Sequence, residues 1–338
     1  MPGAAETTAL LLASLLLGLA GARVARWHAL RLNLLDQPGE RRSHAVPTPR
    51  GGGVGIVASW LLAWAWVALR TPVPPAIVAA AIGGMGLVAG VGWIDDHRPL
   101  SAWIRLLAHL VAGAGVGAAL LVAGATPLVA ASGFLAVAVL VNVWNFMDGI
   151  DGIAATQAAL AALAWALLDE AGPVTVVALA LVAGCCGFLP MNLPRARIFL
   201  GDVGSGALGF ALAMLLALQM GQSAETPLYW LVLVLPLTAF LVDASLTLVR
   251  RMVLGHRWWT PHVSHAYQQL AAWQGRHWPV TLAYAAWTGC TCLVALLVPP
   301  GEAPFTIGAF IGCCGAGAMA WWAATGRTHR IGRDTVDE

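Results

Sequence analysis

Long apolar stretches, separated by short polar segments, make up most of this 338-residue sequence. About 20 largely apolar residues can cross the hydrocarbon core of a bilayer as one helix. We therefore predict an all-α integral membrane protein, a polytopic helix bundle with about eleven transmembrane helices. The predicted helices cover residues 7–27, 54–70, 76–94, 103–123, 128–146, 153–168, 173–190, 204–220, 228–249, 279–298 and 304–325.

The polar connections alternate between two kinds. One kind is short and almost free of arginine, and it comprises residues 71–75, 124–127, 169–173, 221–227 and 299–304. The other kind is rich in arginine and histidine, and it comprises residues 31–53, 95–105, 145–152, 191–205 and 250–279. Basic residues favour the cytoplasmic side of a membrane. This asymmetry predicts a periplasmic N-terminus and a cytoplasmic C-terminus.

Composition agrees with a membrane protein. The sequence is 59% hydrophobic and 10% charged, whereas soluble domains carry roughly 25% charged residues. We expect a single transmembrane domain over 1–338, with the polar motifs within 34–270, the last two spans within 279–325 and a cytoplasmic tail at 326–338. The net charge of +2 argues against a nucleic-acid partner. The six cysteines all lie inside apolar runs, where they are expected to pack as small hydrophobic side chains.

Five carboxylates lie at helix ends on the predicted cytoplasmic face. Asp95 and Asp96 end the third apolar stretch, Asp148 and Asp151 precede the sixth, and Asp202 begins the eighth. Two adjacent carboxylates at a helix C-terminus are disfavoured by the helix dipole and call for a cation. Oxygen ligands suit Mg²⁺, with Mn²⁺ as the alternative. Any one of these residues could instead cap a helix or pair with an arginine.

Two histidines on the same face are candidates for contacts to a phosphate. His262 and His265 are three residues apart and would share one face of a helix. They could donate hydrogen bonds to phosphate, bind a metal ion or contribute only interfacial polarity. We favour phosphate, because no cysteine or third histidine nearby completes a zinc site.

The segment before the second apolar stretch is a candidate anion site. It contains His44 and Arg50, followed by Gly51 and Gly52 at the start of a predicted helix. Backbone N–H groups at a helix N-terminus can bind an anion. The alternative is that the glycines form only a turn.

The one-sided distribution of polar residues distinguishes between classes of membrane protein. A transporter of anionic substrates would be expected to place ionisable groups near the middle of the membrane, with broken helices there. Here the polar residues gather at one interface, which suits a soluble donor that meets a lipid acceptor. A CDP-alcohol phosphotransferase would have Ala-Arg soon after its first Asp-Gly, whereas Asp148 is followed by GIDGIAATQ.

Four motifs occur in the order expected of a known family. They are GWIDDHRPLSAWIRL, NVWNFMDGIDG, FLGDVGSGALG and PHVSHAYQ. The sequence resembles the polyprenyl-phosphate N-acetylhexosamine-1-phosphate transferases (glycosyltransferase family 4), most closely the branch that initiates O-antigen and similar surface polysaccharides. The peptidoglycan-precursor (MurNAc-pentapeptide) branch, which is the alternative, usually has three consecutive histidines where this chain has His262-Val-Ser-His265. Many relatives also have a third Asp after the pair that matches Asp95 and Asp96, which this chain lacks.

The resemblance implies a multi-pass enzyme of the bacterial inner membrane with a cytoplasmic active site. It implies a UDP-N-acetylhexosamine donor, an undecaprenyl phosphate acceptor, release of UMP and dependence on Mg²⁺, and it is compatible with a homodimer. It leaves the sugar open. The implied roles are Mg²⁺ ligand for Asp202, catalysis near the metal and the acceptor for Asp95 and Asp96, and catalysis on the donor side for Asp148 and Asp151. Contacts to uridine are implied for Asn145, Asn192 and Phe199, and contacts to the diphosphate for His262 and His265. Asp95 and Asp96 are also candidate metal ligands, and either could take a proton from the lipid phosphate.

Overall fold

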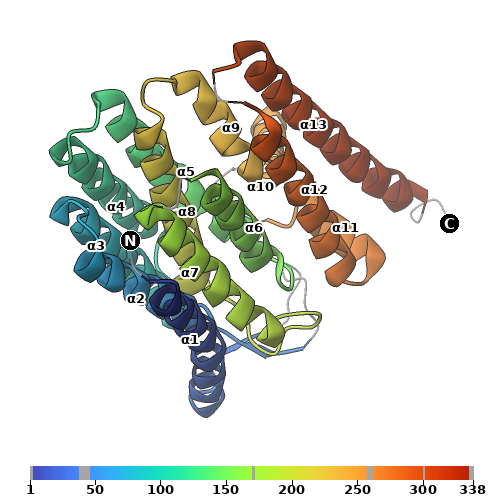
Figure 1. The fold of residues 1–338 in the computed structure, drawn as a ribbon. Helices are drawn as coiled ribbons and strands as arrows, with labels where there is room; N and C mark the ends of the chain where they lie inside the picture. The colour runs from blue at the N-terminus through green and yellow to red at the C-terminus, as the bar shows by residue number, and fades with distance from the viewer. Residues whose placement is uncertain (1–2, 38–45, 170–171, 257–261, 300, 335–338) are drawn as a thin grey trace.

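The computed structural model describes residues 3–37, 46–169, 172–256, 262–299 and 301–334. Over these residues the protein is a bundle of helices with one short antiparallel hairpin (Figure 1). The elements are α1 (Ala4–Arg31), β1 (Leu35–Asp36), β2 (Thr48–Pro49), α2 (Val54–Arg70), α3 (Pro75–His97), α4 (Ala102–Val122), α5 (Pro127–Met147), α6 (Ile153–Leu168), α7 (Pro173–Phe188), η1 (Leu189–Met191), α8 (Asp202–Gln222), η2 (Pro227–Tyr229), α9 (Trp230–Val234), η3 (Leu235–Leu237), α10 (Thr238–Val253), α11 (Ala266–Gln274), α12 (Trp278–Leu297) and α13 (Ala303–Asp334).

The structure confirms the all-α polytopic fold. Within the described residues, nine helical segments are long and apolar enough to cross a membrane, and α2 and α6 are shorter apolar helices. Each predicted span therefore has a helical counterpart. The ninth is not one regular helix, because Pro236 lies in a 3₁₀ turn between α9 and α10, where proline cannot donate a backbone hydrogen bond. The orientation of the two termini stays a prediction.

Helix α8 is the centre of the bundle. It lies among α3, α5, α6 and α7 (Figure 1), and nearly all of its side chains are buried. Small residues make this packing close, since a side chain at Gly209 would overlap the backbone of α5 at Leu140 and Val141. Inside a membrane, such close backbone contacts replace the hydrophobic effect as the main source of helix association. The position of α8 is thereby fixed by its neighbours along its whole length.

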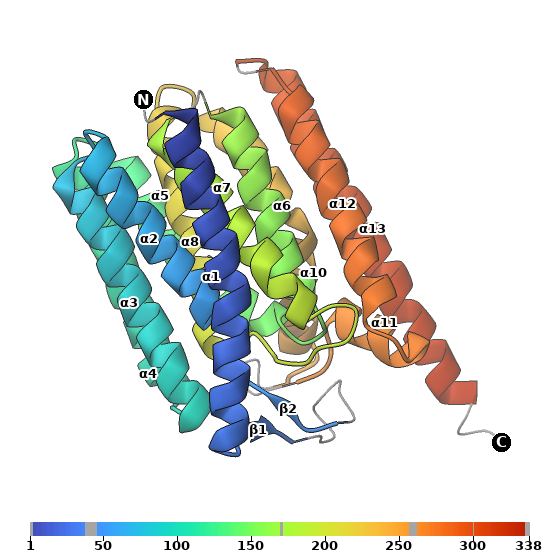
Figure 2. The same cartoon turned by 60° about the horizontal axis from the view of Figure 1, so that its bottom comes forward.

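The start of α8 is held by two further glycine contacts. A side chain at Gly92 in α3 would overlap the backbone of Asp202, and one at Gly53 would overlap Gly204. The β1–β2 hairpin lies at the same end of the bundle (Figure 2). The ends of α3 and α5 and the start of α8 therefore converge there, as the sequence predicts for its acidic motifs.

Helices α12 and α13 form the other flank of the molecule. Helix α12 packs against α6, and α13 packs against α10 and α11. In Figure 2, α13 runs along the outer side and away from α1 to α8. Helix α12 begins beside the loop between α5 and α6. Its first residues therefore lie close to the ends of α3 and α5 and the start of α8.

Candidate active site

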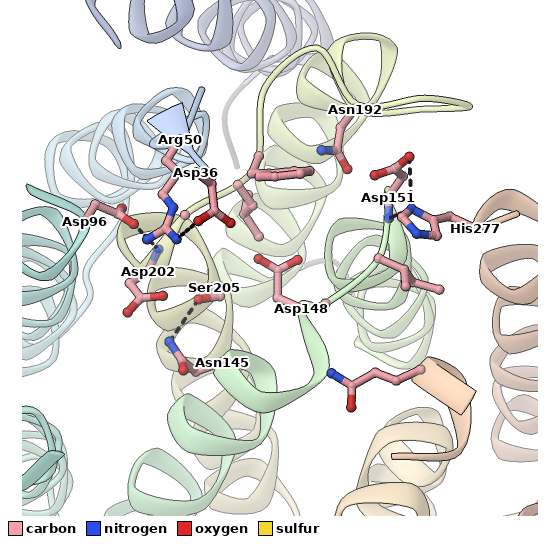
Figure 3. Close-up of a pocket in the computed structure, with 16 residues that line it drawn as sticks. Asp36, Arg50, Asp96, Asn145, Asp148, Asp151, Asn192, Asp202, Ser205 and His277 are labelled. Atoms are coloured by element: carbon pink, nitrogen blue, oxygen red, sulfur yellow. Dashed lines mark hydrogen bonds and ion pairs between the residues drawn. The ribbon is translucent and has the colours of Figure 1, made fainter. Parts of the chain in front are cut away.

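A polar pocket of about 810 Å³, including its open mouth, lies where these helix ends converge (Figure 3). Its walls come from the β1–β2 hairpin, the ends of α3 and α5, the loop before α8 and the starts of α8 and α12. The residues predicted from the sequence that line it are Arg50, Asp96, Asn145, Asp148, Asp151, Asn192, Phe199 and Asp202. The structure thus brings together residues that are up to 152 positions apart in the sequence.

Asp96 joins the end of α3 to the start of α8. Its Oδ1 accepts a hydrogen bond from the Asp202 N–H (3.0 Å), and its Oδ2 accepts one from the Val203 N–H (3.1 Å). The first N–H groups of a helix have no partners within the helix, and they favour a negative charge. Asp96 therefore caps α8 from a neighbouring helix, because Gly201 at the cap position has no side chain. This contact explains how a carboxylate is tolerated at the C-terminal end of α3.

Asp95 and Asp202 share one arginine. The Arg105 Nη1 lies 2.7 Å from Asp95 Oδ2 and 3.2 Å from Asp202 Oδ2. The other oxygen of Asp95 accepts the Leu100 N–H at 2.5 Å. Asp95 is therefore engaged on both oxygens in the turn between α3 and α4, and it does not line the polar pocket.

Asp148 is the least engaged carboxylate of the pocket. It follows the last residue of α5 and accepts no hydrogen bond from the described part of the chain. Burial, together with the smaller effect of the nearby charges of Asp96 and Asp151, raises the pKa of its carboxyl group to about 8. A carboxylate at this place gains stability from a bound cation or proton.

Asp151 is paired with a histidine that the sequence analysis did not select. The Asp151 Oδ2 lies 3.2 Å from His277 Nδ1, and the Thr281 hydroxyl donates to the Asp151 carbonyl (2.7 Å). His277 occupies the position before the first residue of α12 and also lines the pocket. In Figure 3, Asp148 lies between this pair and the side formed by Asp96 and Asp202.

The amide side chains at the site have structural partners. The Asn192 Oδ1 accepts the Gly152 N–H (2.5 Å), and its Nδ2 donates to the Ile198 carbonyl (2.8 Å). The Asn145 Nδ2 donates to the Ser205 hydroxyl (3.3 Å). Asn192 thus joins the loop after α5 to the loop before α8. The predicted contacts of Asn145, Asn192 and Phe199 to uridine stay predictions.

The hairpin contributes an ion pair and corrects one expectation. Arg50 pairs with Asp36, an unselected residue on β1, and both line the pocket. The predicted anion site needs free N–H groups on the glycines, but the Gly52 N–H donates to the Phe199 carbonyl (2.9 Å). Gly52 therefore attaches the start of α2 to the loop before α8, and its N–H is not free for an anion. The roles predicted for Arg50 and Gly51 stay predictions. His44 lies outside the described residues.

The predicted histidine pair lies beside the pocket instead of in its wall. The His262 and His265 rings are 4.9 Å apart, but neither side chain lines the polar pocket. His265 is buried as the cap of α11, with its Nδ1 3.6 Å from Asp243 Oδ1. Burial lowers the pKa of His262 to about 4, so it is uncharged at neutral pH. The contacts of both residues to the diphosphate stay predictions.

Asp243 positions α11 next to the site. Its Oδ1 accepts the Ala266 N–H (2.9 Å), and its Oδ2 accepts the Tyr267 N–H (3.2 Å) and the Tyr284 hydroxyl (2.7 Å). The Tyr267 hydroxyl in turn donates to the Phe146 carbonyl (3.0 Å) at the end of α5. This network fixes α11 against α5 and so closes one side of the pocket.

The carboxylates of the pocket fit a metal ion that is bound together with a substrate. Among the described residues, no three His, Cys, Asp or Glu side chains are grouped as a ready-made metal site. Mg²⁺ usually takes one or two carboxylates plus phosphate oxygens of the substrate. Asp202, which lines the pocket, supplies an oxygen ligand of this kind.

Comparisons with known proteins agree with this geometry. The sequence profile of glycosyl transferase family 4 matches residues 78–220, which include the ends of α3 and α5 and the start of α8. The decaprenyl-phosphate N-acetylglucosaminephosphotransferase of Mycobacterium tuberculosis is 31% identical, over 78% of this chain and 75% of the relative. A probable undecaprenyl-phosphate N-acetylglucosaminyl 1-phosphate transferase of Bacillus subtilis is 28% identical, over 74% and 73% of the two chains.

The peptidoglycan branch is also similar, over a shorter region. The phospho-N-acetylmuramoyl-pentapeptide-transferase of Thermosynechococcus vestitus is 34% identical, over 49% of this chain and 50% of the relative. Identity above 30% over three quarters of both chains, together with the profile match, confirms the resemblance seen in the sequence. The chain belongs to glycosyl transferase family 4, the polyprenyl-phosphate N-acetylhexosamine-1-phosphate transferases.

Proposed function

We propose that this protein transfers N-acetylhexosamine-1-phosphate from a UDP-sugar to undecaprenyl phosphate and releases UMP. The product would be the first lipid-linked intermediate of O-antigen or a similar surface polysaccharide. The observation that carries the proposal is the convergence of Asp96, Asp148 and Asp202 on one polar pocket at the end of an apolar helix bundle. The names of the relatives, which act on decaprenyl or undecaprenyl phosphate, support it.

The proposed reaction is a phosphoryl transfer. An oxygen of the lipid phosphate bonds to the phosphorus that carries the sugar, and the bond from that phosphorus to the bridging oxygen breaks. The electron pair leaves with UMP. We favour this direct displacement over an aspartyl intermediate, because such reactions depend mainly on positioning and electrostatics.

The residues of the pocket have distinct parts in this scheme. Arg50 and Arg105 lie at the pocket and beside it, where their charges would offset those of the two substrates. Asp148 is the candidate to take a proton from the lipid phosphate, since it accepts no hydrogen bond from the described residues and its raised pKa of about 8 suits a base near neutral pH. Asp95 and Asp96, the candidates from the sequence, are engaged by Arg105 and by the start of α8.

Asp202 is the residue that would hold Mg²⁺ or Mn²⁺ with the diphosphate of the donor, which leaves Asp148 free to take the proton. The ion would neutralise charge on the phosphates and on the departing UMP. Asp202 is suited to this role because its backbone is fixed by Asp96 and Gly92, so that its carboxylate is held at the pocket. The arginine-rich connections support a site on the cytoplasmic face of the bacterial inner membrane, where a nucleotide donor is available.

A transfer assay with purified protein tests the proposal. Undecaprenyl phosphate would be offered with UDP-GlcNAc, its 6-deoxy relatives and UDP-MurNAc-pentapeptide in turn, and lipid-linked product would be measured. We expect Mg²⁺-dependent product with at least one N-acetylhexosamine donor. Product from UDP-MurNAc-pentapeptide alone would assign the protein to the peptidoglycan branch, and no product from any donor would refute the proposal.

A further inference from the structure

An apolar cavity lies on the flank of the bundle, between α10, α11, α12 and α13. It encloses about 620 Å³, including its mouth, which is within the range of ~300–1000 Å³ that is typical of ligand pockets. Apart from two residues of α11, its lining belongs to the candidate membrane spans Pro227–Val253, Trp278–Leu297 and Ala303–Gly326. We call it the α12–α13 cavity, lined by Ala283, Tyr284 and Trp287 of α12 and by Gly317, Ala320 and Trp321 of α13.

Helices α12 and α13 enclose the cavity because they separate along their length. Near the short connection between them, Ala295 of α12 and Phe310 of α13 belong to one apolar cluster. Further along, small residues take the place of such contacts, since Ala283 and Ala320 both line the cavity and are exposed. The cavity therefore opens sideways, between two transmembrane helices, toward the surrounding lipid.

The polar groups in and behind the wall of the cavity are already paired. The Tyr284 hydroxyl donates to Asp243 Oδ2 (2.7 Å). The Trp321 Nε1 donates to the Thr247 hydroxyl (3.1 Å). The other lining side chains are aliphatic or aromatic, and an apolar cavity of this kind stays dry but binds apolar molecules. The ligand that fits is therefore a hydrocarbon, and the membrane at the mouth supplies one in the acyl chains of its phospholipids.

Helix α11 separates this cavity from the polar pocket. Ala266 and Leu270, four residues apart, share the face that lines the cavity. Gln268 lies between them in the sequence and lines the polar pocket instead. A molecule in the cavity therefore contacts the back of the helix whose front closes the proposed active site.

A chain of hydrogen bonds joins the wall of the cavity to the start of α11. Trp321 of α13 donates to the Thr247 hydroxyl, and this hydroxyl donates to Asp243 Oδ1 (3.0 Å). The same oxygen accepts the Ala266 N–H at the first residue of α11 (2.9 Å). A displacement of α13 would break the first of these bonds. An apolar chain that fills the space between α12 and α13 therefore stabilises the helix that closes the pocket.

We propose that the α12–α13 cavity binds one acyl chain of a membrane phospholipid, and that this chain holds α11 in the position that closes the polar pocket. Binding of the donor would then depend on a lipid that takes no part in the reaction. The location of the chain is independent of the proposed function, whereas its effect on the donor rests on that function.

A phosphatidylcholine with a diazirine in the middle of one acyl chain tests the location. It would be irradiated with the full-length protein in lipid nanodiscs, and labelled peptides would be identified by mass spectrometry. Residues 305–311 and 317–324 of α13 lie at similar distances from the middle of its span, so an unspecific probe would label both alike. We expect at least fivefold more label in 317–324, without competition by undecaprenyl phosphate.

Three results of this experiment would overturn the inference. Equal labelling of the two segments would show that the probe only samples the lipid-facing surface. Weaker labelling of 317–324 would show that another occupant, such as a second copy of the chain, covers the cavity. Competition by undecaprenyl phosphate would assign the cavity to the acceptor.

Two neighbouring substitutions give a matched comparison. Ala320→Trp places a ring in the cavity, whereas Met319→Trp places the same ring at an adjacent residue that is 68% exposed and does not line the cavity. We expect Ala320→Trp to reduce the labelling of 317–324 at least fivefold and Met319→Trp to leave it within twofold of wild type. Ala324→Leu, a smaller obstruction, should reduce it at least twofold and keeps the test valid if Ala320→Trp does not fold. Unchanged labelling in the folded variants would contradict the inference.

A second pair of variants tests the link from the cavity to α11. Trp321→Phe keeps an apolar ring in the wall but removes the N–H that donates to Thr247. Trp322→Phe makes the same change at a residue that is 74% exposed and does not line the cavity. We expect Trp321→Phe to speed backbone hydrogen exchange in residues 266–274 at least fivefold and to raise the donor KM at least threefold, with the acceptor KM within twofold of wild type. Equal effects of the two variants would refute the link.

Labelling and hydrogen exchange need no turnover, so they separate this inference from the proposed function. A protein that labels in the cavity but transfers no sugar phosphate would refute the proposed function alone. An active protein with evenly labelled helices would refute the cavity alone.

Discussion

Replacing Asp148 with asparagine should make the protein more stable and inactive. The carboxyl group of Asp148 accepts no hydrogen bond from the described residues and lies near the charges of Asp96 and Asp151. Asparagine keeps its size but removes the charge. The loss of repulsion should raise the melting temperature of metal-free protein, and the loss of the proposed base should lower turnover by about 10²-fold or more.

The pH dependence of this gain follows from the direction of the pKa shift. The pKa of Asp148 is raised from 3.8 to about 8 in the folded protein, so its ionised form is disfavoured there relative to the unfolded chain. The wild-type protein should therefore lose stability as the pH rises from about 4 to about 8, whereas the asparagine variant should not lose this contribution. One pKa unit corresponds to about 1.4 kcal/mol, and solvent screening at the open pocket reduces the total. We expect a difference of ~1–3 kcal/mol at pH 8, seen as a rise of several degrees.

Thermal unfolding in EDTA from pH 5 to pH 8 measures this difference. Asp169→Asn is the matched control, because Asp169 accepts hydrogen bonds from Gly172 and Thr175 and lies in the predicted periplasmic loop. That variant should lose stability at every pH and keep its turnover. A melting temperature of Asp148→Asn that stays at or below the wild-type value up to pH 8 would refute the reasoning.

Three further variants test separate parts of the site. Asp202→Asn should lower turnover by about 10²-fold, with little recovery at high Mg²⁺, and a normal rate with normal Mg²⁺ dependence would remove Asp202 from the metal site. Asp243→Asn should lower the melting temperature by an amount equivalent to ~1–3 kcal/mol, because an amide nitrogen cannot accept the hydrogen bonds that α11 now donates. An unchanged melting temperature would contradict the capping role of Asp243. His277→Ala should raise the donor KM at least fivefold and leave the acceptor KM unchanged, since His277 pairs with Asp151 in the polar pocket. Equal shifts in both KM values would contradict a role of His277 on the donor side.

The helices and the convergence of the acidic motifs could be predicted from the sequence for physical reasons. An apolar stretch of sufficient length must form a helix in a bilayer, because its backbone groups have no other partners there. Loops of one charge type fall on one side, so Asp96, Asp148 and Asp202 were expected at the same end of the bundle, and all three line the pocket.

The remaining contacts depend on which helices are neighbours, and the sequence does not reveal this. His277 reaches Asp151 because α12 packs against α6, although the two residues are far apart in the chain. Asp36 belongs to the site only because it lies opposite Thr48 in the hairpin, where its carboxylate pairs with Arg50. Asp243 caps α11 because that helix folds back onto α10. None of these pairings has a periodicity or motif that marks it.

The transfer of phosphorus together with the sugar is the central claim, and a double-label experiment tests it most directly. Purified protein in nanodiscs would receive undecaprenyl phosphate, Mg²⁺ and a UDP-N-acetylhexosamine labelled with ³H in the sugar and ³²P at the sugar-linked phosphorus. The account predicts that both labels enter the lipid fraction in equal amounts and that UMP is released, with neither event in Asp202→Asn. Tritium in the lipid with ³²P left in water as UDP, or no labelled lipid with any donor, would contradict it.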